Sequence, residues 1–229
     1  MTPIKKGKVA VMVVGHKEYW PQFSGLRERL LKNADSFEAL IEKQGVEIVR
    51  FTAEDGTQMC DSPELSYQAG VYFKTQDVDL VFLFLTCYVA SGRYMQGVLA
   101  CPAPVVVVGY QKSRDFAVMT MYDDNAGGGA CPVPEACNAL IRCLKPPAGV
   151  IFGEYFGNGR FAPRFESDVS DWCKVANVLR SYRGAIIGHM GHSYEGMLDM
   201  NFDPTTFTRT FGIHIRMVEM CELVNYVQE

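Results

Sequence analysis

Side chains able to do chemistry gather in two stretches of the sequence, each directly after an apolar run. The first stretch is GHKEYW at 15–20 and the second is GHMGHSYEGM at 188–197. Aromatic rings can stack on the flat face of a sugar, while imidazole, hydroxyl and carboxylate groups hydrogen-bond its hydroxyls. Histidines and carboxylates can also hold a divalent metal or transfer protons. Both stretches are therefore candidate binding loops.

The elements that must position these loops alternate between strand and helix. Continuous apolar runs such as VFLFL and VVVV are typical of parallel strands that are covered on both faces. Between them, apolar residues recur at helical spacing. Strands are predicted at 9–14, 46–51, 79–86 and 105–109, and helices at 22–44, 63–75, 92–101 and 135–143. The fold class is α/β, beginning with a doubly wound, parallel-sheet, Rossmann-like domain.

A domain boundary is predicted near Lys145, because Pro146 and Pro147 end the preceding helix. Residues 1–145 then form the N-terminal Rossmann-like α/β domain, and residues 146–229 form the start of a second α/β domain. Strands are expected there at 150–155, 184–188 and 213–220, with a helix at 165–181. About 80 residues are few for an independent core. We therefore expect the second domain to be incomplete and the chain to be truncated.

The composition and charge of the sequence argue against nucleic-acid-binding and membrane-spanning proteins. The formal charge of −4 gives no basic footprint for nucleic acid. No apolar run reaches the length of a membrane span, and the N-terminus has no signal-peptide cleavage pattern. The eight cysteines form no CxxC pair and are interpreted as buried thiols. We expect a cytoplasmic protein that binds neither nucleic acid nor membrane.

Ligands of open α/β sheets bind beyond the carboxyl ends of the strands. Three loops are predicted to follow strand ends and to line one crevice: GHKEYW, TCYVASGR at 86–93 and NAGGGAC at 125–131. The glycines Gly127–Gly129 could cradle a phosphate, although GxGxxG and GK[ST] spacings are absent. A nucleotide-dependent enzyme thus remains an alternative.

The spacing of His189 and His192 also allows a metal site, but the glycines around them indicate a loop without fixed geometry. Glu195 and Asp199, like Glu219 and Glu222, form carboxylate pairs that could serve acid–base chemistry. Nothing in the sequence brings these carboxylates together.

Four stretches in succession resemble the N-terminal half of the L-fucose and L-arabinose isomerase superfamily. They are VGHKEYWPQFSGLRERL, LTCYVASGRYMQGVLACPAPVVVV, DDNAGGGACPVPEACNALI and IIGHMGHSYEGMLDMNFDPTTFTRTFGIHIRMVEMCELV. The resemblance covers nearly all of the chain and depends on the order of the stretches, since no single motif is diagnostic. It implies two Rossmann-like domains followed by a β-rich domain, and a working trimer or hexamer.

The resemblance also implies roles for particular residues. Lys17, Tyr19 and Trp20 match a loop that touches the sugar across a subunit boundary, although this loop departs from the arabinose isomerase pattern. His192, Tyr194, Glu195 and Met197 match a second-domain loop that faces the sugar. The divalent metal, usually Mn²⁺, is held in that family by residues later in the chain. No metal ligand or catalytic residue is therefore assigned among these 229 residues.

The sequence thus predicts the N-terminal portion of a metal-dependent aldose–ketose isomerase, which contributes oligomer contacts and substrate-covering loops and is inactive by itself. The alternative is a stand-alone sugar-binding α/β module without catalysis. Trp20 is expected to lie on an exposed loop, so that its removal weakens sugar affinity and changes stability little.

Overall fold

The computed structural model describes residues 5–112 and 131–228. The chain divides into two compact units, and the described residues are 6–112 and 131–177 in the larger unit and 5 and 178–228 in the smaller. The division falls inside one long helix, α5 (Pro163–Tyr182). Each unit has its own sheet, and the two are described separately.

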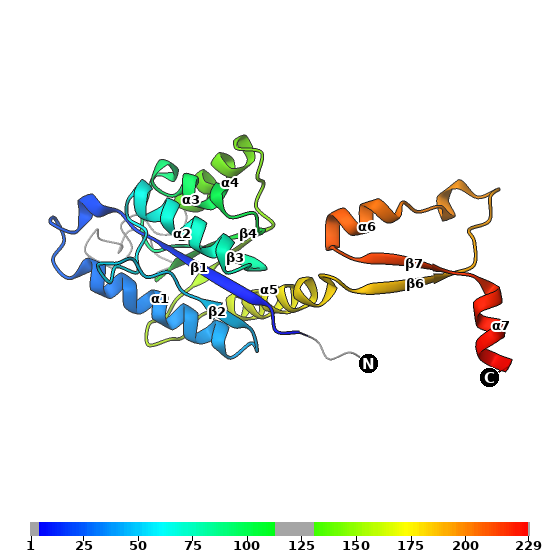
Figure 1. The fold of residues 1–229 in the computed structure, drawn as a ribbon. Coiled ribbons are helices and arrows are strands. Elements are labelled where there is room, and N and C mark those ends of the chain that lie inside the picture. The colour runs from blue at the N-terminus through cyan, green and yellow to red at the C-terminus, as the bar shows by residue number, and fades with distance from the viewer. Residues whose placement is uncertain (1–4, 113–130, 229) are drawn as a thin grey trace. The chain divides into compact units, whose positions relative to one another are not determined.

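The larger unit is built on a five-stranded parallel sheet with the strand order β2-β1-β3-β4-β5 (Figure 1). Its strands are β1 (Lys8–Val14), β2 (Glu47–Val49), β3 (Leu80–Leu85), β4 (Val105–Gln111) and β5 (Gly149–Glu154). Every residue of β3 and β4 is buried, which explains why these strands read as unbroken apolar runs. The predicted α/β class with a parallel sheet is confirmed.

Helices cover both faces of this sheet. One face packs against α1 (Leu26–Glu42) and the first part of α5, with Phe37 and Phe165 among the fully buried residues. The other packs against helices that follow β2, β3 and β4 in the chain. These are α2 (Pro63–Thr75), α3 (Met95–Ala100) and α4 (Pro132–Arg142). The arrangement is the three-layer sandwich expected of a doubly wound fold.

The boundary predicted near Lys145 differs from the structure. Strand β5 was expected to open the second domain, but it pairs with β4 and completes the first sheet. Pro146 and Pro147 lie in the short connection between α4 and β5, where Ala148 N–H donates to Val105 O. The compact units instead meet between Asn177 and Val178. The proline pair marks a turn within the larger unit.

The smaller unit contains a two-stranded parallel sheet of β6 (Ile186–Met190) and β7 (His214–Val218). Helix α6 (Pro204–Phe211) joins the two strands, and α7 (Met220–Gln228) follows β7 (Figure 1). Helix α6 was not predicted. Neither α6 nor α7 contains a buried residue. No helix in the described parts of the chain is long and apolar enough to cross a membrane.

Candidate functional site at the carboxyl ends of strands β1 and β3

The strand order places β1 between β2 and β3, and the chain passes from one side of β1 to the other. In open α/β sheets this point of reversal is where ligands bind, beyond the carboxyl ends of the strands. The loop after β1 contains η1 (Lys17–Tyr19), and the loop after β3 contains η2 (Ser91–Arg93). Two of the three loops predicted to share a crevice are therefore neighbours. The third, with Gly127–Gly129, lies outside the described residues.

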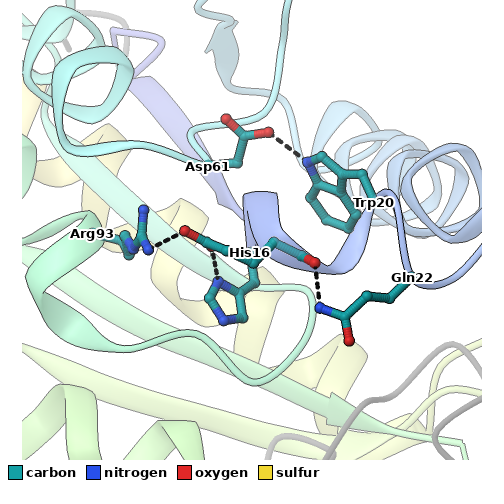
Figure 2. A network of polar contacts seen from close by, with 6 residues as sticks. His16, Trp20, Gln22, Asp61 and Arg93 are labelled. Atoms are coloured by element: carbon teal, nitrogen blue, oxygen red, sulfur yellow. Dashed lines mark hydrogen bonds and ion pairs between the residues drawn. The ribbon is translucent and has the colours of Figure 1, made fainter.

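Glu18 links the two loops. Its carboxylate forms an ion pair with the guanidinium of Arg93, and Oε2 lies 2.8 Å from Nδ1 of His16 (Figure 2). The His16 contact has the distance of an ion pair but does not have the geometry of a hydrogen bond. On the other side, Gln22 Nε2 donates a 2.6 Å bond to the backbone oxygen of Glu18. These contacts fix η1 against the loop that follows β3.

The charge of Glu18 is stabilised in place. Its pKa is lowered, first by hydrogen bonding to its own backbone and then by Arg93 and His16. Its side chain is nevertheless 48% exposed, so solvent screens these interactions. The Glu18–Arg93 pair therefore contributes little to stability, and its main effect is to hold the two loops next to each other.

A third loop is attached through Trp20. Its indole Nε1 donates a 2.6 Å hydrogen bond to Oδ2 of Asp61, which follows β2 and is 6% exposed (Figure 2). The backbone reinforces this contact, because Gly15 N–H donates to Cys60 O. A side chain at Gly15 would overlap Met59 and the Trp20 ring, so one of these side chains would have to shift.

A series of buried hydrogen bonds lies beneath the site and joins the strand ends. Asn33 Nδ2 donates to the Tyr110 hydroxyl at 2.9 Å, and that hydroxyl donates to Thr86 O at 3.3 Å. The Thr86 hydroxyl donates in turn to Val14 O at 2.7 Å. The ends of β1, β3 and β4 are therefore held together with α1. Burial keeps such bonds effective, since water cannot compete for the partners.

The thiol nearest the site is not activated. Burial raises the pKa of Cys87 to about 11, opposed by hydrogen bonds from Thr86 and the backbone of His16. Burial likewise raises the pKa of Cys60 to about 12. A thiolate is the nucleophilic form of cysteine. These two residues pack as apolar side chains.

The residues predicted for the first loop lie together at this site but differ in exposure. Lys17 is exposed, whereas Tyr19 and Trp20 are partly buried and pack against the core. The Tyr19 ring meets the rings of His16 and Phe23 edge to face. The expectation that Trp20 is an exposed loop side chain is wrong, because Trp20 packs against the core of the larger unit.

The predicted residues of the second loop lie in the smaller unit, and all four are exposed. His192, Tyr194, Glu195 and Met197 follow β6, and His192 Nε2 lies 3.4 Å from Glu219 Oε2. Met197 N–H donates to Tyr194 O within the loop. His189 has different surroundings, since its ring meets Phe202 edge to face. The two histidines therefore do not share one set of neighbours.

Two possible metal donors lie close together in the smaller unit. His192 and Glu219 supply two possible donors, and the described ranges contain no group of three or more His, Cys, Asp and Glu residues placed to hold a metal ion. Divalent ions in proteins are usually held by more donors than this pair provides. No chemical step is assigned to a metal on these residues.

Sequence reasoning missed Asp61 and Arg93 as parts of the site. Asp61 follows the short strand β2, and Arg93 lies in the loop after β3 that was predicted to line the crevice, but neither residue was assigned a role. Their partners lie 41 and 75 residues earlier in the chain, so sequence spacing carries no signal of the contacts. No protein-family model matches the sequence, and no curated protein matches it.

Proposed function

We propose that this chain is the N-terminal portion of a metal-dependent aldose–ketose isomerase of the L-fucose and L-arabinose type. In this proposal it supplies fold, oligomer contacts and a loop surface that covers the sugar. The cytoplasmic location and the trimeric or hexameric state expected from the sequence belong to the same proposal. The metal ligands come from a part of the family's chain that follows the region resembled here.

The observation that carries the proposal is the joined loop pair at the reversal point of the sheet. The Tyr19 ring stands there against His16, next to the Glu18–Arg93 pair, and the Trp20 ring of the same loop hydrogen-bonds to Asp61. Rings next to hydrogen-bonding groups suit a sugar, which has apolar faces and hydroxyl edges. Charge balance within the Glu18–Arg93 pair suits an uncharged ligand.

The test uses tryptophan fluorescence. The sequence has two tryptophans, Trp20 and Trp172, so Trp172→Phe leaves Trp20 as the only indole reporter. We expect L-fucose, L-arabinose or a related aldose to change its emission in a saturable way. Arg93→Gln should weaken binding by about three- to tenfold, because the loops lose their link. Arg164→Gln, which removes an exposed ion pair on α5, is the matched control and should bind as the parent does.

Activity is tested on the encoded protein that contains these 229 residues, supplied with Mn²⁺ and a panel of aldoses and ketoses. Interconversion of one aldose and its ketose supports the isomerase proposal. Saturable sugar binding without conversion would instead favour the stand-alone sugar-binding module. If no sugar is bound and none is converted, the isomerase proposal and the sugar-binding module are both refuted.

A further inference from the structure

The smaller unit has a strand edge of its own at which polar residues meet. Strands β6 and β7 run parallel with Met190 opposite Val218, so they end together (Figure 1). A 3.1 Å hydrogen bond from Gly191 N–H to Val218 O carries the pairing one residue further. His192 after β6 and Glu219 after β7 are thereby placed side by side. This is the edge at which parallel sheets bind ligands.

The two side chains are close and open to solvent. His192 Nε2 lies 3.4 Å from Glu219 Oε2, with side chains 74% and 55% exposed. An imidazole nitrogen and a carboxylate oxygen this close together can each hydrogen-bond one of two neighbouring hydroxyl groups on a sugar. The carboxylate accepts from one hydroxyl, and the imidazole accepts from or donates to the other. Tyr194, 65% exposed, adds an aromatic ring to the same loop.

Glu222 makes two polar contacts at the start of helix α7 that do not involve the Glu219 carboxylate. Glu222 Oε1 accepts from the Glu219 backbone N–H at 3.2 Å, which is the return contact of a capping box. Glu222 Oε2 also accepts from Arg216 at 2.9 Å. The Glu222 carboxylate is therefore engaged by the Glu219 backbone and by Arg216, and the Glu219 carboxylate faces His192.

We propose that His192 and Glu219 bind two adjacent hydroxyl groups of a polyol, with Glu219 as a binding residue contributed by the end of β7. This inference rests on the proposed function and extends it to Glu219, which the sequence suggested only as one of a carboxylate pair for acid–base chemistry. Arg216 and Glu222 are the nearest other charged groups from β7 and α7, and they are paired with each other.

The experiment follows the histidine ring signals of the whole 229-residue chain by NMR while L-fucose or L-arabinose is added. His192→Gln identifies the His192 signal. We expect sugar to shift that signal, and Glu219→Gln to weaken the response by about tenfold, as expected for loss of a charged hydrogen-bond acceptor. Glu222→Gln removes a carboxylate from the same helix turn and should stay within about twofold of the parent. Circular dichroism checks that each variant is folded.

The outcomes separate the two proposals. If sugar changes Trp20 emission but leaves the His192 signal unmoved, or if Glu219→Gln responds as the parent does, the inference is overturned and the proposed function stands. The His192–Glu219 contact is then an exposed ion pair of little energetic weight. If no sugar affects either reporter, both proposals fail.

Discussion

The indole Nε1 of Trp20 donates a 2.6 Å hydrogen bond to a carboxylate oxygen of Asp61, a residue almost fully buried in the fold (Figure 2). One side chain comes from the loop after β1 and the other from the segment after β2. The contact joins two loops that flank the same strand end. It makes Trp20 part of the framework of the site.

Trp20→Phe should therefore lower the free energy of unfolding by about 1–2 kcal/mol, because a buried carboxylate loses its donor. Urea unfolding followed by circular dichroism measures this. Lys17→Ala, an exposed change in the same turn, should stay within about 0.5 kcal/mol of the parent. A double-mutant cycle with Asp61→Asn should give a coupling above about 0.5 kcal/mol. Additive effects would show that the contact has no energetic role.

The packing of α2 on α3 depends on two glycines. A methyl group at Gly97 would overlap Ser66 O, and one at Gly70 would overlap Gly97 O. Gly97→Ala should destabilise the protein by at least about 2 kcal/mol or prevent folding, because backbone atoms of both helices would have to move. Gly92→Ala is the control, since nothing lies near that position. A Gly97→Ala protein as stable as the Gly92→Ala protein would contradict this packing.

Glu18 should titrate below its ordinary pKa of 4.5. Because the folded-state pKa is lowered, the ionised carboxylate stabilises the fold above the ordinary value, and this contribution is lost as the pH falls through the lowered pKa. Arg93→Gln should raise the Glu18 pKa only in part, since the backbone hydrogen bond, its largest cause, remains. Carboxyl-carbon NMR measures both values. Arg164→Gln should leave the Glu18 pKa unchanged, and an unshifted value in Arg93→Gln would exclude a contribution from the pair.

Much of the larger unit could be predicted from local sequence. Strands β3 and β4 are fully buried, so their composition reports their environment directly. The sequence also predicted that the loops after β1 and β3 lie next to each other, because in parallel sheets the loops that bind ligands lie beyond the carboxyl ends of the strands. The structural role of Trp20 could not be predicted, because its partner Asp61 lies 41 residues later in a segment without a regular pattern. Nothing in the sequence indicates that the two side chains meet.

Two errors have local causes. Helix α6 was missed although Asp203 caps it, Pro204 opens it and Gly212 ends it in the left-handed region. Its eight residues include four threonines, which have low helix propensity, and the spacing of Phe207 and Phe211 is too short a pattern to indicate a helix by itself. The boundary at Pro146 and Pro147 was misplaced because prolines report a turn, whereas strand pairing decides which sheet the next segment joins.

The position of β1 between β2 and β3 also has a consequence for how the protein folds. Glu18 and Arg93 are 75 residues apart, and they can meet only after β3 has inserted beside β1. Closing so long a stretch of chain carries an entropic cost that must be met before any contact repays it. We therefore expect the loop pair to form only after β1 and β3 have paired, and a ribosome-bound chain that ends before Arg93 would carry Tyr19 and Trp20 without the arginine that contacts their loop.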